Sequence, residues 1–407
     1  MDTVDRSNSV SAASGTPAAR AVRERPPLVV YVLGLTIFSL TTSEFMVAGM
    51  MPSLSVALGV TIAEVGYLIS IYAAGMVVGG PLLTLALLKL GVPNKGALLG
   101  LLALYSVGGI IAATADGYGT MVAARIITGV AGSACFGVSL AICAEVVRPD
   151  SRGRASSIVL AGLMLATVLG VPAATLIDQR FGWRASFWLV VALAVLCAAV
   201  IAALVPVSRK SAQISLSTEL ASFRNGRLWA AYATSGLIIG ATFSAFSYVS
   251  PIFTDVTGFS PATVPLLLGA YGAANVIGNA IVGRFADKYT IPILVGGLVA
   301  LAGTLATFAV FADHRIISVV AFIAIGLVGV PMNPALISRV MKTAHPGPLV
   351  NTVHTSVINI GLAAGAWFGG IGIVAGYGLR SPLWIGVALA LLGLVSLMPR
   401  SARRSAQ

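Results

Sequence analysis

Long apolar runs alternate with short polar segments along most of the chain. The first series lies at about 28–52, 62–87, 96–115, 119–146, 154–178 and 185–207, and the second at about 228–254, 262–286, 291–312, 316–341, 349–375 and 380–398. Each run has about the 20 residues that a helix needs to cross the hydrocarbon core of a bilayer. Strands of a membrane barrel would instead alternate apolar and polar residues over about 10 positions. The pattern therefore predicts an all-α membrane protein with twelve transmembrane helices.

The polar segments divide the chain into two halves. We expect residues 1–27 to be a disordered tail, because they are polar and rich in Ser, Ala and Arg. A polar, basic loop at 208–227 separates an N-terminal set of six spans, 28–207, from a C-terminal set, 228–398. A short basic tail, 399–407, follows. The first apolar run is too long for the core of a cleavable signal peptide, so we expect it to be the first span.

Composition excludes several classes of protein. Charged residues make up 9% of the chain and the mean hydropathy is +0.97, whereas soluble domains carry about 25% charged residues. A soluble enzyme, a disordered chain and a nucleic-acid-binding domain are all disfavoured. The net charge of +12 is better explained by membrane orientation than by a nucleic-acid partner. The three cysteines lie in apolar segments, and no metal-ligand spacing is present.

The basic residues predict the orientation of the spans. If both termini are cytoplasmic, 20 of the 25 lysines and arginines face the cytoplasm. The outer side then carries Arg180, Arg184, Arg315 and Arg380, and Arg125 lies within a span. Cytoplasmic loops are enriched in Lys and Arg, so the sequence predicts cytoplasmic termini.

Two charged residues lie well inside spans, where charge is costly and often functional. Glu44 is in the first span and Arg125 in the fourth. At 1.5 Å per residue, Glu44 is ~12 Å and Arg125 ~9 Å from the outer ends of their helices. They could pair if the two spans are neighbours. Glu44 could then be a protonatable coupling site, or the pair could be a permanent salt bridge that locks the helices.

A charged motif follows the eighth span. It contains Gly283, Arg284, Asp287 and Lys288. These residues could bind a neighbouring helix or its dipole, or they could only reflect the usual enrichment of basic residues in cytoplasmic loops. Aligning Gly79 with Gly278 places Lys89 on Lys288 and Leu88 on Asp287. This is a weak internal repeat of the kind that transporters often show.

Small, kinking and polar residues recur within the spans. Gly75, Gly79, Gly80, Gly129 and Gly132 are suited to close helix packing in lipid. Pro172, Pro331 and Pro334 predict breaks or packing kinks in the fifth and tenth spans. Residues that could line a cavity, or equally could bridge helices, are Thr42, Tyr72, Phe136, Phe243, Tyr248, Asn275, Asn333, Asn359 and Trp367. We interpret His354 as an interface residue that makes hydrogen bonds, rather than as a proton carrier.

These residues together resemble the major facilitator superfamily, in particular its twelve-helix drug:proton antiporter branch. The similarity covers about 28–398 and includes bacterial arabinose or sugar-efflux, purine-efflux and chloramphenicol-resistance exporters. It is carried by TSEFMVAGMMPSL, ARIITGVAGSA, LGVPAATLIDQRFGWRASFW, GRFADK and NTVHTSVINIGLAAGAWFGG.

The resemblance implies two pseudo-symmetric six-helix bundles around a cavity lined by spans one, four, seven and ten, with rocking between two access states. It implies proton coupling at Arg125 and Gly129, an antiporter motif at Gly170 and Pro172, and gating at Gly283, Arg284, Asp287 and Lys288, with Gly80 and Lys89 in the matching region of the first half. Two positions depart from the pattern. Leu88 stands in place of an acidic residue, and Ala174 stands where a glycine is common.

The predicted function is a secondary exporter that exchanges protons for a small molecule such as a drug, sugar or other metabolite. We expect it to be a monomer in the bacterial inner membrane, with the lipid bilayer, protons and substrate as partners. We expect no cofactor, because the proton gradient supplies the energy and no phosphate-binding glycine loop is present. The alternatives are a proton-coupled importer of the same fold and a transport-dead sensor. An enzyme is disfavoured because no acid/base or metal-ligand cluster is found.

Overall fold

The computed structural model describes residues 26–148, 151–206, 223–343 and 348–397. The predicted tails, 1–27 and 399–407, lie almost entirely outside these ranges, and so does the part of the predicted central loop, 208–227, that precedes residue 223. Their boundaries stay predictions.

Helices make up nearly all of the described chain. The N-terminal half contains α1 (Leu28–Gly49), α2 (Met51–Leu58), α3 (Ile62–Lys89), α4 (Asn94–Ala113), α5 (Tyr118–Val146), α6 (Arg152–Leu165), the π-helix η2 (Ala166–Gly170), α7 (Val171–Phe181) and α8 (Trp183–Leu204). The C-terminal half contains α10 (Gly226–Phe246), α11 (Val249–Pro251), η3 (Ile252–Val256), η4 (Pro261–Thr263), α12 (Val264–Phe285), α13 (Thr290–Val310), α14 (Arg315–Val328), η5 (Val330–Met332), α15 (Asn333–Thr343), α16 (Pro348–Gly372), η6 (Ile373–Tyr377) and α17 (Ser381–Leu397).

The apolar runs correspond to these helices. In the described residues, eleven helical segments are long and apolar enough to cross a membrane, and the apolar α17, at 17 residues, takes the twelfth position. The predicted all-α fold with twelve spans is confirmed, and most ends agree to within a few residues. The first span differs, because α1 ends at Gly49 and α2 starts anew with Pro52 in its first turn.

Several spans are interrupted in the middle. The fifth consists of α6, η2 and α7, with Pro172 in the first turn of α7. The tenth changes from α14 to α15 through the 3₁₀ turn that contains Pro331. Proline cannot donate a main-chain hydrogen bond and clashes with the preceding turn, so the predicted breaks are confirmed at both sites.

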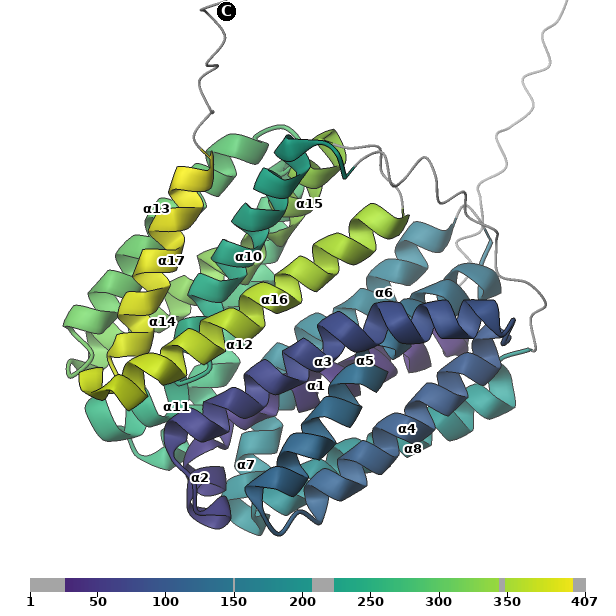
Figure 1. Ribbon diagram of the computed structural model, residues 1–407, viewed down its shortest axis with the longest axis horizontal. Helices are drawn as coiled ribbons and strands as arrows, with labels where there is room; N and C mark the ends of the chain where they lie inside the picture. Colours follow the sequence, from purple (N-terminus) through teal and green to yellow (C-terminus); the bar gives the residue numbers. More distant parts are fainter. Residues whose placement is uncertain (1–25, 149–150, 207–222, 344–347, 398–407) are drawn as a thin grey trace, which may run out of the picture.

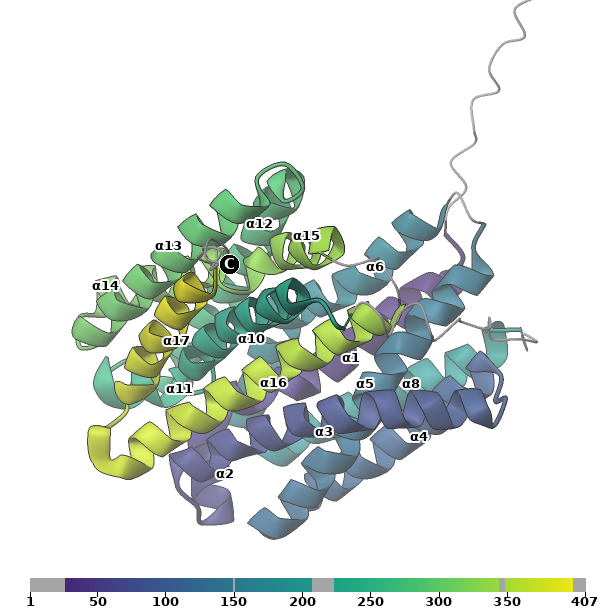
Figure 2. The same cartoon turned by 45° about the horizontal axis from the view of Figure 1, so that its top comes forward.

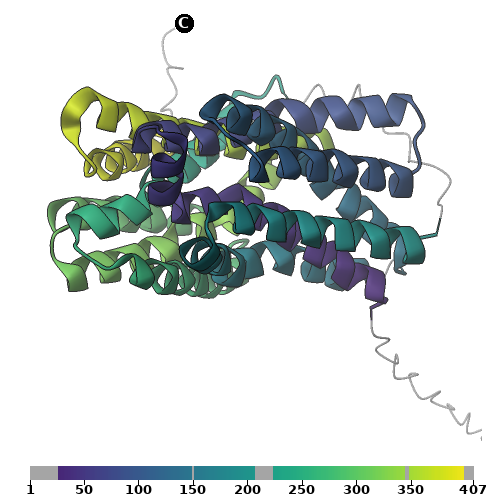
Figure 3. The same ribbon diagram turned by 90° about the horizontal axis from the view of Figure 1, so that it is seen from below.

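The helices form two bundles that lie side by side (Figures 1 and 3). Helices α1 to α8 pack with one another, as do α10 to α17, and the bundles meet through α3 with α16 and through η2 and α7 with α12. Figure 2 shows α3 and α16 running next to each other. We call the end that carries α2 and Gly182 the α2 end, and the end that carries Leu28, Leu204 and Gly226 the terminal end.

Glycine residues on α3 and α5 allow these two helices to approach each other closely. A Cβ atom on Gly129 would overlap the main-chain oxygen of Tyr72, and one on Gly79 would overlap Val130. Cβ atoms on Gly75, Gly80 and Gly132 would also press against the facing helix. The predicted use of these glycines for close packing is confirmed.

Basic residues separate between the two ends. Arg184 pairs with Asp116 and Arg380 with Asp313, while Arg315 donates to the oxygen of Gly258. All of these loops are at the α2 end. Among the described residues, the helix ends and loops at the terminal end carry most of the remaining lysines and arginines. This segregation is the one that the sequence predicted.

Candidate functional site

A buried arginine lies where α1, α3 and α5 meet. Arg125 is fully buried. Its Nη1 donates to the main-chain oxygen of Ser43 at 2.8 Å, its Nη2 to that of Glu44 at 3.1 Å, and its Nε to that of Leu68 at 3.4 Å. Its Cζ also lies 4.1 Å from the centre of the Tyr72 ring. Carbonyl oxygens and a π face together offset part of the cost of burying a guanidinium.

The carboxylate of Glu44 has different surroundings. The contact between Arg125 and the Glu44 main chain confirms that the two residues lie at the same depth. Among the described residues, however, no hydrogen bond or ion pair reaches the carboxylate of Glu44, and its side chain keeps partial exposure. The salt bridge that the sequence suggested is therefore not formed in this conformation. Arg125 is occupied by main-chain oxygens, which leaves the carboxyl group of Glu44 without an ion-pair partner among the described residues.

Aromatic rings surround the position next to Glu44. Phe45 stacks on Phe243 of α10, with ring centres 5.2 Å apart, and meets Phe246 edge-on at 6.2 Å. Phe246 lies 4.9 Å from Tyr271 of α12. These rings carry the contact from the N-terminal bundle into the C-terminal bundle, starting at the residue that follows Glu44 in α1. Phe243 was among the cavity residues that the sequence predicted, whereas Phe45 and Phe246 were not. Adjacency to Glu44 was the available signal for Phe45.

The contacts between bundles run from mid-bundle to the α2 end. Ser70 Oγ donates to the oxygen of Ala363 at 2.9 Å, and the Tyr67 and Trp367 rings lie 4.9 Å apart. Ser250 Oγ donates to the oxygen of Gly49 at 3.3 Å. These contacts hold the two bundles together from mid-bundle to the α2 end.

Tyr248 belongs to the same closed region. It is fully buried, and its hydroxyl donates to the oxygen of Ala366 at 2.7 Å. A Cβ atom on Gly66 of α3 would overlap this hydroxyl, so the glycine makes room for it. The structure thus places Tyr248 in a contact between bundles, apart from the Glu44 region.

The other proposed cavity residues are distributed among the helices. Asn275 in α12 is buried, and its Oδ1 has no hydrogen-bond partner among the described residues; the same is true of Oδ1 of Asn333 at the start of α15. Asn359 is buried in α16, and Phe136 is partly buried in α5. Orphaned buried amide oxygens are costly unless water or a ligand reaches them, which keeps Asn275 and Asn333 as candidates.

Glycine and proline of the fifth span shape its contact with α1. A Cβ atom on Gly170 would overlap the hydroxyl of Thr42, which is buried and donates to the oxygen of Phe38 at 2.7 Å. Pro172 follows directly after η2 and approaches Gly269 of α12. Thr42 therefore lies in the packing between α1 and η2.

The motif after the eighth span lies at the terminal end. Gly283 and Arg284 belong to the last turn of α12, and a Cβ atom on Gly283 would meet open space. The main-chain oxygen of Asp287 accepts a hydrogen bond from Lys342 of α15 at 2.5 Å, which ties this turn to the tenth span. Lys89, its counterpart in the first half, is exposed at the end of α3. The structure does not bring the two motifs together through a described side-chain contact.

His354 holds two helices of the C-terminal bundle together. It is buried, its Nε2 lies 2.8 Å from Ser235 Oγ, and its ring stacks on Tyr232 with centres 5.6 Å apart. The interpretation of His354 as an interface residue is confirmed.

Comparison with known proteins agrees with this geometry. The sequence model of the Major Facilitator Superfamily matches residues 33–353. The chain is 31% identical over 379 residues to a chloramphenicol resistance protein of Streptomyces lividans, covering 92% of this chain and 96% of that protein. It is 32% identical over 379 residues to the inner membrane transport protein YdhP of Escherichia coli strain K12, covering 93% and 96%. It is 25% identical over 382 residues to a probable sugar efflux transporter of Pasteurella multocida, covering 93% of each.

Solved structures show the same fold at low sequence identity. A bacterial homologue of the human lysosomal transporter Spinster, in an inward-facing and occupied conformation, superimposes with a TM-score of 0.72 at 14% identity, covering 92% of this chain and 97% of that one. The nucleoside transporter NupG superimposes with a TM-score of 0.71 at 15% identity, covering 92% and 99%.

Proposed function

The chain belongs to the Major Facilitator Superfamily, and we propose on this premise that it is a proton-coupled exporter of a small molecule. It is a multi-pass membrane transporter and not an enzyme. Export is favoured by its similarity to a chloramphenicol resistance protein and to a probable sugar efflux transporter. Proton coupling, direction and substrate class are the proposed parts.

The observation that carries proton coupling is the separation of roles between two neighbouring residues. Arg125 is anchored by main-chain oxygens of Ser43, Glu44 and Leu68. The carboxyl group of Glu44 keeps partial exposure and has no ion-pair partner among the described residues. A fixed cation beside it favours the ionised form, whereas removal from water inside the bundle favours the neutral form. Such a balance suits a group that must take up a proton in one access state and release it in the other.

The surroundings of Glu44 support an amphipathic substrate. Phe45, Phe243 and Phe246 form an aromatic cluster between the bundles, and Phe45 follows Glu44 directly in α1. Aromatic faces bind apolar and weakly cationic groups, and one carboxylate favours neutral or cationic over anionic compounds. Drugs of the chloramphenicol type, sugars and nucleosides fit this description. Substrate and proton would compete for Glu44 or for the conformation that exposes it.

Alternating access requires the bundles to separate at the α2 end. The contacts of Ser70 with Ala363 and of Ser250 with Gly49 are the ones that must break. We propose that the α2 end faces outside and the terminal end faces the cytoplasm, so that the conformation described here is closed to the outside. The segregation of lysine and arginine supports this orientation.

The test measures substrate-driven proton movement in proteoliposomes that contain a pH-sensitive dye. A panel of chloramphenicol, arabinose and adenosine is added outside. An antiporter that carries substrate inward drives protons out, so the lumen becomes alkaline. We expect this signal in the native protein and its loss in Glu44→Gln. Glu64→Gln is the matched control, since Glu64 is partly exposed and its carboxylate caps the start of α3 through Thr61.

Each result has a defined meaning. An acidic lumen would indicate symport and favour the importer. A full signal in Glu44→Gln would show that another group carries the proton. Silence with all three compounds, in protein that unfolds cooperatively on heating, would contradict proton antiport of these classes.

A further inference from the structure

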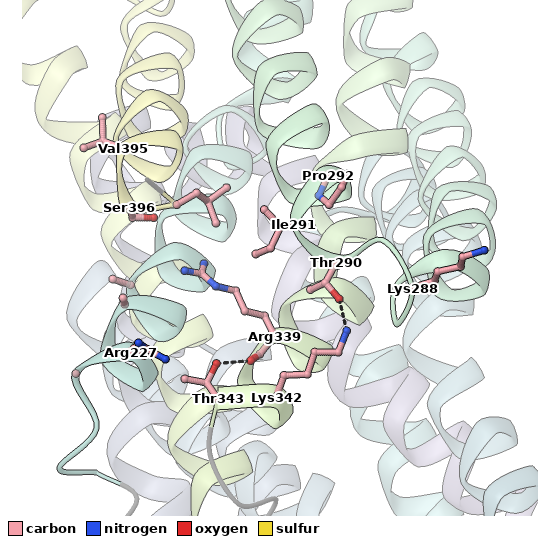
Figure 4. Close-up of a pocket in the computed structure, with 14 residues that line it drawn as sticks. Arg227, Lys288, Thr290, Ile291, Pro292, Arg339, Lys342, Thr343, Val395 and Ser396 are labelled. Carbon is pink, nitrogen blue, oxygen red and sulfur yellow. Dashed lines mark hydrogen bonds between the residues drawn. The ribbon is translucent and has the colours of Figure 1, made fainter. Parts of the chain in front are cut away.

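A large cavity lies at the terminal end of the C-terminal bundle, away from Glu44 and Arg125. It has a volume of about 1040 Å³ and is bordered by α10, the turn before α13, α13, α15 and α17 (Figure 4). These are the ends of four membrane-crossing helices, so the cavity opens near the depth of the lipid headgroups. It shares none of the residues proposed for proton coupling.

The lining of this cavity is strongly cationic. Among the residues that the structure describes, it includes Arg227, Lys288, Arg339 and Lys342 and no acidic residue. Asp287 is the acidic residue next to it, and it contributes its main-chain oxygen, which accepts from Lys342 Nζ. Four positive charges without a carboxylate in one cavity are unfavourable by themselves and favour an anionic occupant.

Arg339 is the anchor of the cationic lining. It is partly buried, and among the described residues its guanidinium donates a single hydrogen bond, from Nη1 to Thr234 Oγ1 at 2.6 Å. Thr234 Oγ1 in turn lies 2.6 Å from Ser396 Oγ of α17. A guanidinium has five N–H groups in a planar fork that matches phosphate oxygens. The hydroxyl therefore fixes the side chain and leaves donors for an anion.

Lys342 and Thr290 form the opposite wall. Lys342 Nζ donates to Thr290 Oγ1 at 2.8 Å, as the dashed line in Figure 4 shows. The ammonium is thus held between α13 and α15 and faces the same cavity as Arg339. Arg227 is exposed at the start of α10. Its long side chain adds a further positive charge to the lining of the cavity.

Apolar surface continues from the cationic cavity. Ile291 and Val395 border it and are 47% and 59% exposed. Beyond Pro292 lies a second hollow of about 400 Å³, lined by Ile281, Val282, Phe285, Tyr289, Pro292 and Ile293. Pro292 belongs to both cavities. A cationic cavity joined to an apolar one is suited to a molecule with an anionic head and a hydrocarbon chain.

We propose that the cavity binds the phosphate headgroup of an anionic phospholipid of the bilayer, with Arg339 and Lys342 on the phosphate and an acyl chain along Ile291 and the hollow beyond Pro292. Basic pockets at helix ends bind such headgroups in other membrane proteins. The lipid would join α10, α13, α15 and α17 at their ends and so stabilise the C-terminal bundle. This proposal does not depend on proton coupling or on the transport direction.

The test measures lipid binding to the purified full chain in detergent, by native mass spectrometry and by thermal unfolding. Phosphatidylglycerol, phosphatidylcholine and inorganic phosphate are compared. The pocket variant is Arg227→Gln with Lys342→Gln, because both side chains are exposed and the partly buried Arg339 stays in place. The matched control is Lys89→Gln with Arg154→Gln, which removes two exposed cations from the terminal end of the other bundle.

We expect the native protein to prefer phosphatidylglycerol over phosphatidylcholine, and the pocket variant to lose about tenfold in affinity for phosphatidylglycerol while the control does not. An equal loss in both variants would reduce the effect to general basic charge and overturn the proposal. Competition by millimolar inorganic phosphate as effective as that by the lipid would assign the cavity to free phosphate instead. Equal binding of the two lipids would also overturn it.

Discussion

Arg125 reaches α1 through the main-chain oxygen of Glu44, with Nη2 and O 3.1 Å apart, and not through the Glu44 carboxylate. This arrangement fixes the depth and orientation of the arginine independently of the protonation state of its neighbour. A salt bridge would have to break each time the glutamate takes up a proton. Here the guanidinium can stay in place while Glu44 changes charge, and it acts on Glu44 through its field.

The first prediction concerns the shape of the Arg125 side chain. In Arg125→Lys the positive charge is kept, but an ammonium cannot reach the oxygens of Ser43 and Leu68 together while lying on the Tyr72 ring. Losing one hydrogen bond from a charged group costs about 1.5–3 kcal/mol. We expect the rate of substrate-driven proton movement to fall by about tenfold or more, measured in proteoliposomes.

The control for this variant is Arg184→Lys. Arg184 is exposed at the α2 end, where it contacts Asp116 and the oxygen of Ala115. Exposed pairs contribute little, so this variant should transport normally. Full activity in Arg125→Lys would mean that charge alone is needed at this position and that the main-chain contacts are dispensable.

A second prediction concerns the close approach of α3 and α5. In Gly129→Ala the new methyl group would overlap the main-chain oxygen of Tyr72. Main-chain atoms cannot move aside cheaply, so we expect the helices to separate and the protein to lose about 1–3 kcal/mol of stability. Thermal unfolding in detergent measures the loss, and the displaced Tyr72 should also slow transport.

Gly137→Ala provides the matched control on the same helix. A Cβ atom on Gly137 would meet nothing within 4 Å. Alanine favours the helix over glycine by about 1 kcal/mol, so this variant should be as stable as the native protein or slightly more so. If both alanines had the same effect, steric overlap with Tyr72 would not be the cause.

The sequence predicted the fold in detail because bilayer thickness sets the length of each span. The helices begin and end close to the limits of the apolar runs, and the depth of Glu44 and Arg125 followed from the helical rise alone. The glycines of α3 and α5 were also identifiable, since lipid-embedded helices need small residues where they touch. Proline marked the interruptions at η2 and η5.

Contacts between distant segments could not be derived in the same way. The predicted depths showed that Glu44 and Arg125 could meet. They did not show that Arg125 would donate its hydrogen bonds to main-chain oxygens, because every residue carries such an oxygen and none of them is marked in the sequence. Phe45 and Phe246 are unremarkable in an apolar sequence and become a cluster only when α1 meets α10. The cationic cavity likewise joins Arg227 and Arg339, which are more than 100 residues apart and each explicable as a loop charge.

A third prediction separates packing from proton transfer at His354. In His354→Gln the stacking on Tyr232 is lost and the bond to Ser235 is weakened, which should cost about 1 kcal/mol. Substrate-driven proton movement should persist, because no acidic or basic side chain among the described residues hydrogen-bonds to His354. Loss of proton movement at unchanged thermal stability would instead give His354 a part in coupling.

The last prediction tests whether the α2 end must open during transport. Ser70 and Ala363 face each other across the two bundles, with Ser70 Oγ 2.9 Å from the oxygen of Ala363. In a Ser70→Cys and Ala363→Cys variant, a short reducible thiol cross-linker should join the bundles and stop transport, and reductant should restore it. The native cysteines Cys135, Cys143 and Cys197 are replaced by alanine in all variants, and each single variant controls for labelling alone. Transport that continues after complete cross-linking would show that the bundles need not separate at this contact, because a covalent link across it would then leave the cycle intact.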